Sequence, residues 1–199
     1  KTPPILLASE SPRRRLLLEA MGFEFKVQSP VTDELDASAV TVDDIVVENA
    51  LRKARSLRDH AATDTTIIIG ADTLVLCDGQ VLAKPTDKAD ARTMLSRLSG
   101  KRHDVLTGVA VVSRKHGQQT SLTKSGVYFR KLPAEEIERY IATKEPYDKS
   151  GAYAIQGLGA IFIDHIEGSY TNVVGLPVEQ LLRDIQRLVG VSVFEWFGK

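Results

Sequence analysis

The chain has 199 residues, its 26 basic and 26 acidic side chains balance, and its one cysteine is Cys77. Balanced charge argues against a nucleic-acid binder that depends on counterion release along a phosphate backbone, although it leaves room for one compact basic pocket. A single cysteine cannot form an internal disulfide, and no segment approaches the roughly 18 uninterrupted apolar residues of a membrane span. We therefore expect a cytoplasmic protein whose partners include neither nucleic acid nor a membrane.

Three consecutive arginines, Arg13-Arg14-Arg15, stand where the first helix is expected to begin, shortly after an apolar strand at 5–8. Ser11 is the predicted N-cap and Pro12 the first helical residue. The expected apolar stripe is Leu16, Leu17, Ala20 and Met21. Cations at a helix N-terminus oppose the helix dipole at a cost of roughly 0.3–1 kcal/mol each, whereas a bound phosphate would reverse that cost. The alternative is an ordinary solvated stretch of surface arginines.

The next predicted elements are a strand at 23–27, an acidic loop at 29–38, and a long helix that Thr41 caps and that runs to about residue 60. The apolar face of this helix is expected at Val46, Ala50, Ala54 and Leu57. Lys53 lies at the edge of that face, where a lone lysine is usually a snorkelling surface residue. In the acidic loop, Glu34 is a candidate ligand of a hard divalent cation, although acidic loops are usually only solvated.

Asp72 follows a buried strand at 65–69 and is the first candidate for catalysis. An acid at the carboxyl end of a buried strand lies where open α/β sheets bind their ligands. A carboxylate beside cations suits the hydrolysis of a phosphate ester or anhydride, in which the acid activates water or holds a metal.

A hairpin over 74–84 with the turn Asp78-Gly79 is expected to bring a cation to Asp72. Its register pairs Cys77 with Gln80, so that Thr73 faces Lys84 and Asp72 lies at the same end of the hairpin. The simpler alternative is a surface ion pair at a turn.

Helices and strands alternate through the rest of the chain. Helices are expected at 86–98, 133–143 and 177–188, and strands at 105–112, 121–129 and 160–166. Strands that are partly joined by hairpins and partly by helices predict an α/β fold with a mixed β-sheet flanked by helices.

Three glycines, Gly151, Gly157 and Gly159, flank Gln156. Glycine lets the backbone approach a ligand closely, and the glutamine amide offers both donors and acceptors to a nucleobase edge. The spacing matches neither a dinucleotide-binding fingerprint nor a P-loop. The alternative is a glycine-rich turn between strands.

Several ordered motifs extend over nearly the whole chain. They are Ser9-x-Ser11-Pro12-Arg13-Arg14, Glu34, Lys53, Gly70-Ala71-Asp72-Thr73, Lys84-Pro85, Leu98-Ser99-Gly100, the stretch from Glu145 to Gly159, and Asn172-Val173-Val174-Gly175-Leu176-Pro177. In this combination the chain resembles the Maf family of septum-formation-type nucleotide pyrophosphatases. The resemblance implies a single Maf-like domain over 1–199 with two lobes, an elongated mixed sheet and a central cleft, as in inosine-triphosphatase-like folds. It also implies a homodimer, and Mg²⁺- or Mn²⁺-dependent hydrolysis of a nucleoside triphosphate to its monophosphate and pyrophosphate.

The same resemblance implies roles for individual residues. Asp72 is the expected general base, and Glu34 and Asp72 are the expected metal ligands. The phosphate-contacting residues are expected to be Ser9, Arg13, Arg14, Lys53 and Lys84. The combination of Arg13, Thr73 and Gln156 resembles the branch that acts on dTTP and UTP, because the branch that acts on 7-methyl-GTP has tryptophan, glutamine and glutamate there. Glu10 and Arg15 depart from the family pattern.

Two other functions stay open on the sequence alone. The first is a nucleotide-binding regulator of cell division and septum formation with little hydrolysis. Glu34 and Asp72 disfavour it, since anion binding gains nothing from nearby carboxylates. The second is a nucleic-acid binder that uses the arginine cluster and shows salt-sensitive affinity for oligonucleotides.

Overall fold

The computed structural model describes residues 2–33, 35 and 41–196. The strands are β1 (Ile5–Ala8), β2 (Phe25–Gln28), β3 (Ile67–Cys77), β4 (Gln80–Leu82), β5 (Arg102–Ser113), β6 (Gly117–Phe129) and β7 (Ile163–Glu167). The α-helices are α1 (Pro12–Ala20), α2 (Val42–Ser56), α3 (Lys88–Leu98), α4 (Ala134–Ile141), α5 (Tyr170–Val174) and α6 (Val178–Val189). Short 3-10 helices lie at Arg58–His60, Glu145–Asp148, Ser150–Ala152, Leu158–Phe162 and Val193–Trp196. None of these described helices has the length and apolar character that a membrane crossing requires.

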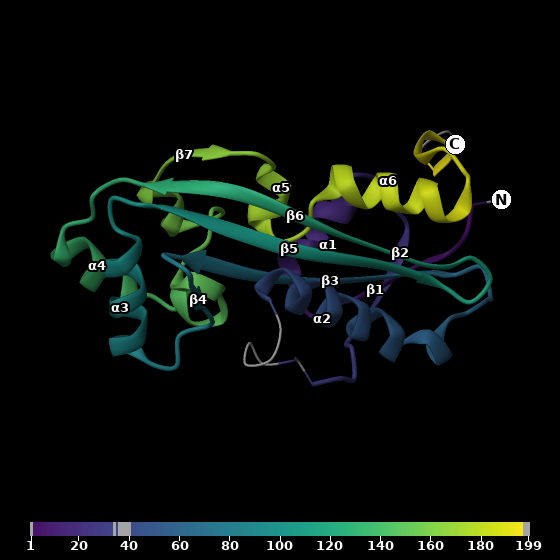
Figure 1. Cartoon of the computed structure of the whole chain (residues 1–199), viewed down its shortest axis with the longest axis horizontal. Coiled ribbons are helices and arrows are strands. Elements are labelled where there is room, and N and C mark those ends of the chain that lie inside the picture. The colour runs from purple at the N-terminus through teal and green to yellow at the C-terminus, as the bar shows by residue number, and fades with distance from the viewer. Residues whose placement is uncertain (1, 34, 36–40, 197–199) are drawn as a thin grey trace. The chain divides into compact units, whose positions relative to one another are not determined.

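The seven described strands form one mixed sheet (Figure 1). Their order is β2-β1-β3-β5-β6-β7, and β4 pairs with β3 outside this series. β1 is parallel to both β2 and β3, whereas β4 is antiparallel to β3 and β7 is antiparallel to β6. The predicted α/β class with a mixed sheet is therefore confirmed.

The chain divides into two compact units. The first consists of Lys1–Asp72, Thr107–Thr123 and Gly175–Lys199, and the second of Thr73–Leu106 and Lys124–Val174. The boundaries fall inside β3, β5 and β6, so each of these strands contributes residues to both units.

The first unit buries both faces of its part of the sheet, with α2 on one face and α6 on the other (Figure 1). Leu7 of β1 and Ile69 of β3 pack in the core that contains residues of α1 and α6. Leu6 and Ile68 pack in the opposite core, against α2. A strand that is covered on both faces has no polar face, which explains the continuous apolar runs in β1 and at the start of β3.

The second unit has a separate core beneath α3 and α4. An aromatic cluster at its centre contains His103, Phe129 and Tyr153, whose ring centroids are 4.7–5.4 Å apart. His103 Nε2 and the Tyr153 hydroxyl form a buried hydrogen bond of 2.7 Å. The cluster links β5 and β6 to the segment that follows the 3-10 helix Ser150–Ala152.

The apolar stripe predicted for α1 was partly wrong. Leu16 is 53 % exposed and Met21 is 36 % exposed, whereas Leu18 is fully buried. Successive helical residues are about 100° apart, so Leu16 lies on nearly the opposite face from Leu18. The core therefore selects Leu18 and, in part, Leu17.

Other element boundaries also differ from expectation. β3 does not stop at Ile69 but continues through Asp72 to Cys77 as an 11-residue strand. Residues 158–162 form a 3-10 helix, so β7 begins only at Ile163, and α5 was not predicted. The Thr41 cap on α2 is confirmed, because the Asp44 N–H donates to Thr41 Oγ1 at 3.3 Å.

Candidate functional site

The arginine-bearing end of α1 is held by Ser9 and Arg14. Ser9 is buried, and its hydroxyl accepts from the Ser11 N–H at 3.1 Å and from Arg14 Nη1 at 3.3 Å. Arg14 Nε also donates to the carbonyl oxygen of Gly175 at 2.8 Å. Two motifs that are 161 residues apart therefore meet at one guanidinium group.

The first turn of α1 is positively charged. It contains no acidic residue, and the side chain of its N-cap residue, Ser11, makes no capping hydrogen bond. Arg13 is half-buried in the same turn. Arg15 instead forms an exposed ion pair with Glu19 at 3.4 Å.

Asp72 forms a buried ion pair with Lys53. Lys53 Nζ donates to Asp72 Oδ1 at 2.7 Å, and the two side chains are only 10 % and 8 % exposed. The usual expectation of a snorkelling surface lysine was therefore wrong for Lys53. The pair therefore places a buried carboxylate of β3 beside a buried cation of α2 within the first unit.

The close approach of α2 to β3 at Gly70 makes this pair possible. A Cβ atom on Gly70 would lie 2.1 Å from the Ala50 carbonyl oxygen and 2.8 Å from the Ala54 nitrogen. Only glycine allows the backbone of α2 to pack directly against β3 at this position, which brings Lys53 of α2 next to Asp72 of β3.

Asp72 also lies near the end of β1, although it does not end its own strand. The last residue of β1, Ala8, is paired in parallel register with Gly70, so Ser9 and Asp72 both come shortly after the last pair of the β1–β3 ladder. The sequence-based placement of Asp72 at the end of its own strand was wrong, because β3 continues to Cys77. The neighbouring strand, β1, does end next to Asp72, opposite Gly70. The carboxyl end of a parallel strand is where α/β sheets place ligands.

Asn49 is a site residue that sequence reasoning missed. It is 2 % exposed, its Nδ2 donates to Asp72 Oδ2 at 3.3 Å, and its Oδ1 accepts from the Leu35 N–H at 2.8 Å. One signal was available: Asn49 and Lys53 are four residues apart, so two polar residues share one helical face. Glu34, the predicted metal ligand beside Leu35, lies outside the described residues.

Lys84 and Thr73 belong to the second unit, where the predicted pairing between them was wrong. The hairpin register holds from Cys77 with Gln80 to Val75 with Leu82, and β4 ends there. The segment at 150–151 takes over beyond that point. Ser150 Oγ donates to the Thr73 carbonyl at 3.3 Å, and the Gly151 N–H donates to the Ala83 carbonyl at 3.2 Å. Lys84 is exposed.

Gln156 also belongs to the second unit, in the turn that ends in the 3-10 helix Leu158–Phe162. The side chain is exposed, and its Nε2 donates to the Tyr170 hydroxyl at 3.3 Å. Gly157 has a φ of 117°, a conformation that non-glycine residues rarely adopt.

A family profile described as Maf-like protein matches residues 4–188. The chain belongs to the Maf family. A dTTP/UTP pyrophosphatase of Bacillus anthracis is 43 % identical over 183 residues, which cover 92 % of this chain and 94 % of that protein. A dTTP/UTP pyrophosphatase of Bacillus cytotoxicus is 46 % identical over 182 residues, with the same coverage. Among solved structures, a nucleoside-triphosphatase (dITP/XTP pyrophosphatase) of Mycobacterium abscessus matches 96 % of this chain and 99 % of its own, at 15 % identity and a TM-score of 0.43.

The donor set of this Maf-family chain fits a hard divalent cation at Asp72. A carboxylate has about four lone-pair directions, and the Lys53 and Asn49 hydrogen bonds occupy one on each oxygen. Mg²⁺ is commonly held by one or two carboxylates together with substrate phosphates. Within the described part of the chain, no group of three or more His, Cys, Asp or Glu side chains gathers as a metal cage. Asp72 is the described carboxylate that could contribute to such a site.

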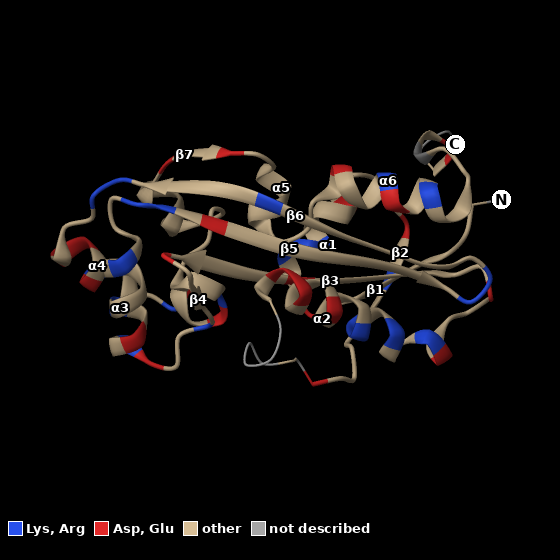
Figure 2. Cartoon of the chain, viewed as in Figure 1, with Lys and Arg blue, Asp and Glu red and all other residues tan. Residues whose placement is uncertain are grey.

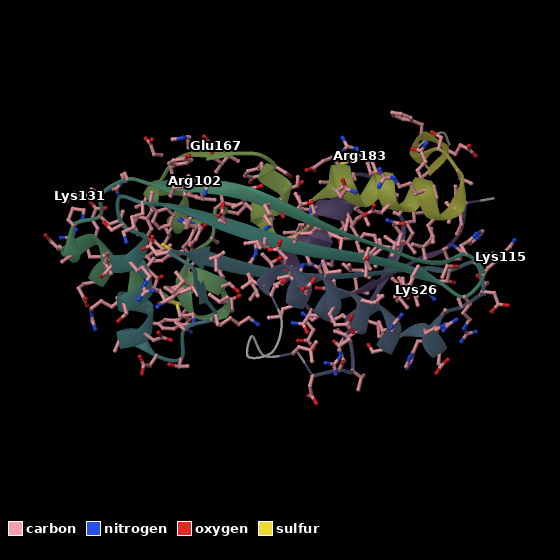
Figure 3. All side chains as sticks on the ribbon, in the orientation of Figure 1. Lys26, Arg102, Lys115, Lys131, Glu167 and Arg183 are labelled. Carbon is pink, nitrogen blue, oxygen red and sulfur yellow. The ribbon has the colours of Figure 1, made fainter. Side chains whose placement is uncertain are left out.

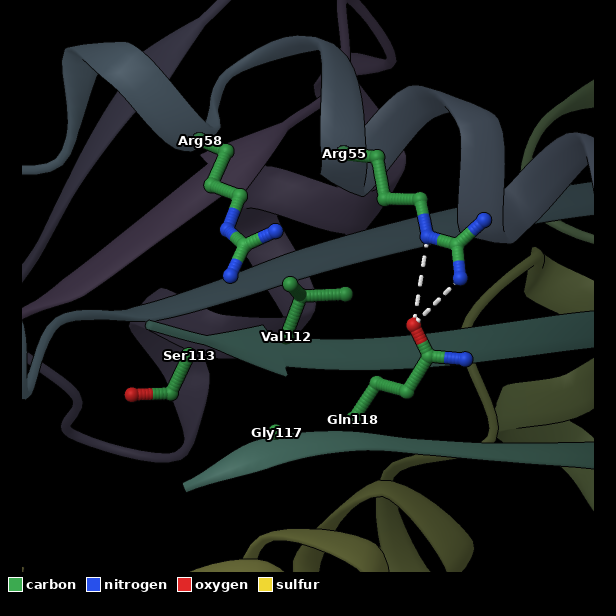
Figure 4. Close-up of a pocket in the computed structure, with 6 residues that line it drawn as sticks. All are labelled: Arg55, Arg58, Val112, Ser113, Gly117 and Gln118. Atoms are coloured by element: carbon green, nitrogen blue, oxygen red, sulfur yellow. Dashed lines mark hydrogen bonds between the residues drawn. The ribbon is translucent and has the colours of Figure 1, made fainter. Parts of the chain in front are cut away.

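Other charged groups among the described residues lie along α2, in the second unit and around a pocket of the first unit. Acids begin α2 and basic residues end it, which complements the helix dipole (Figure 2). In the second unit, Arg102 Nε lies 3.8 Å from Glu167 Oε2 in an exposed pair (Figure 3). A pocket of about 150 Å³ in the first unit is lined by Arg55, Arg58, Val112, Ser113, Gly117 and Gln118 (Figure 4). It contains none of the predicted site residues.

Proposed function

We propose that this chain is a Mg²⁺- or Mn²⁺-dependent nucleoside triphosphate pyrophosphatase that converts dTTP and UTP to the monophosphate and pyrophosphate. The observation that carries the proposal is the buried Asp72 carboxylate, paired with Lys53 at the sheet edge where β1 leads into the arginine-bearing helix. Relatives named dTTP/UTP pyrophosphatase, 43–46 % identical over 92 % of the chain, support the substrate class.

The chemistry assigned to Asp72 is general-base catalysis. Its carboxylate takes a proton from a water molecule whose oxygen attacks the α phosphorus, and the bond from that phosphorus to the bridging oxygen of pyrophosphate breaks. Lys53 and Asn49 hold the carboxylate in one orientation through both of its oxygens. A divalent cation, when held by Asp72 and Glu34, would neutralise phosphate charge.

The basic residues are assigned to the triphosphate. The first turn of α1 offers backbone N–H groups and the Arg13 and Arg14 guanidinium groups, which suit anionic oxygens. Ser9, Lys53 and Lys84 complete the phosphate-contacting set. In this assignment Lys53 has two roles, because it also pairs with Asp72.

Thymine and uracil recognition is assigned to Gln156 and Thr73. The Gln156 amide can both donate to and accept from a pyrimidine edge. Its exposed position in a glycine-rich turn supports this role. In the same proposal, the chain works in the cytoplasm as a homodimer of single Maf-like domains, each made of the two units; the family resemblance supports this part.

The test is pyrophosphate release from a panel of nucleoside triphosphates with Mg²⁺ or Mn²⁺. We expect turnover of dTTP and UTP above that of purine nucleotides. Asp72→Asn should lower kcat at least about 100-fold, since general-base catalysis typically contributes that much. The matched control is Asp59→Asn, because the Asp59 side chain is 97 % exposed. Absence of pyrophosphate release from every nucleotide, together with tight nucleotide binding, would favour the division-linked regulator instead.

A further inference from the structure

Glu145 is the centre of the hydrogen bonds that hold the Gln156 turn. Its Oε1 accepts from the Gly159 N–H at 2.8 Å and from the Tyr140 hydroxyl at 3.0 Å. Its Oε2 accepts from the Leu158 N–H at 2.9 Å. These two N–H groups begin the 3-10 helix that follows Gln156, so the carboxylate caps that helix from another part of the chain.

The turn is shaped to admit this carboxylate. A Cβ atom on Gly157 would lie 2.7 Å from Glu145 Oε2 and 3.0 Å from Oε1. The residue directly after Gln156 must therefore be small as well as able to adopt a positive φ. Glycine at position 157 meets both requirements.

Glu145 is itself held by hydrogen bonds at the start of the 3-10 helix Glu145–Asp148. Its N–H donates to Thr143 Oγ1 at 3.2 Å, and its carbonyl accepts from Lys149 Nζ at 2.7 Å. Tyr140, which donates to its carboxylate, is a core residue of α4 that is only 4 % exposed. The position of the turn is thus tied to the core of the second unit.

The hydrogen bonds around Glu145 favour the ionised form of its carboxylate. Burial raises the pKa of Glu145, but the N–H groups of Gly159 and Leu158 and the Tyr140 hydroxyl outweigh burial and hold the pKa below its ordinary value. An ionised carboxylate accepts all three hydrogen bonds, whereas an amide in its place would turn an NH₂ group toward one of the donors.

We propose that Glu145 is a positioning residue for base recognition, which sets the place of the Gln156 amide and so contributes to the preference for thymine and uracil. The inference rests on the proposed function, because it takes Gln156 as the group that contacts the base. Glu145 acts through the turn and does not itself touch the substrate.

The experiment is a double-mutant cycle of Glu145→Gln and Gln156→Ala, with kcat and KM measured for dTTP and dGTP. Glu145→Gln should raise KM for dTTP about five- to tenfold, the effect of one lost hydrogen bond, and change kcat less. In the Gln156→Ala background it should leave the ratio of kcat/KM for dTTP over dGTP unchanged. Equal effects of Glu145→Gln in both backgrounds would overturn the proposal.

Two further measurements keep the outcome interpretable. Amide hydrogen exchange at Leu158 and Gly159 should accelerate in Glu145→Gln, and faster exchange with an unchanged KM for dTTP would also overturn the proposal. If Glu145→Gln folds poorly, Glu145→Asp takes its place in the experiment. This variant keeps the negative charge on a shorter side chain and should retain part of the dTTP preference of the unaltered protein. Glu135→Gln is the matched control, because Glu135 makes an exposed pair with Arg139 on α4. If the unaltered protein releases no pyrophosphate, the proposed function fails, whereas the exchange data still report on the turn.

Discussion

Lys53 Nζ lies 2.7 Å from Asp72 Oδ1, and both side chains are about nine-tenths buried. Two opposite charges in so dry a place depend on one another, because removal of one leaves the other buried and unpaired. The pair links α2 to β3, and in the proposed function the same contact orients the general base.

Lys53→Met and Asp72→Asn should each destabilise the protein by about 3–5 kcal/mol, and the double variant should lose less than the sum of the two. Urea unfolding of the four proteins gives the coupling energy. The control cycle uses the exposed pair Arg139 and Glu135, which should couple by less than about 0.5 kcal/mol. Strictly additive losses at Lys53 and Asp72 would contradict the pairing.

Asn49→Asp and Asn49→Leu should separate two functions of the Asn49 amide. The aspartate keeps an acceptor for the Leu35 N–H but cannot donate to Asp72, so kcat should fall about tenfold while the Leu35 amide stays protected from exchange. The leucine should lose both. Glu48→Gln, a change on the adjacent residue of α2, serves as the control. Wild-type kcat in Asn49→Asp would show that the contact with Asp72 does not matter for turnover.

Gly70→Ala should destabilise the protein by about 3 kcal/mol or more, since a methyl group there would overlap the backbone of α2 at Ala50. Gly79→Ala is a useful comparison. No atom lies within 4 Å of a Cβ at Gly79, so only its φ of 74° is strained, and the cost should be about 1–2 kcal/mol. Thermal or urea unfolding measures both. Equal losses at the two glycines would mean that α2 tolerates displacement from β3.

His103 should make the protein less stable in acid. Burial lowers the pKa of His103 from 6.5 to about 4, so between these values the unfolded chain binds a proton that the folded chain does not. Stability is then complete above pH 6.5 and falls by about 3 kcal/mol as the pH drops to 4.

Urea unfolding of His103→Phe at pH 7 and pH 4 measures this contribution. The variant should show a pH-dependent loss that is smaller than the wild-type loss by about 3 kcal/mol. His165→Gln, at an exposed histidine, should leave the wild-type difference in place. If the losses of His103→Phe and the wild type agree, His103 is not the group responsible.

The sequence alone determined the residue types of the site and much of the fold. Apolar runs predicted a strand at 5–8 and a buried strand at 65–69, and the structure has β1 and the start of β3 there, with a core on each face. Ordered motifs indicated the Maf family, which the matched profile confirms. Local signals succeeded for the Thr41 cap and the Asp78-Gly79 turn. The Ser11 side chain, in contrast, makes no capping hydrogen bond.

The tertiary structure alone decided which polar groups meet. Helical periodicity by itself placed Lys53 at the surface, Asn49 had no assigned role, and Glu145 was only part of a motif. Their partners are 19, 23 and up to 14 residues away along the chain. Such contacts depend on how closely α2 rests on Gly70 and on where a turn docks against α4, and neither follows from helical or strand periodicity. Composition and spacing selected the chemical groups, whereas burial and register determined which of them share a hydrogen bond.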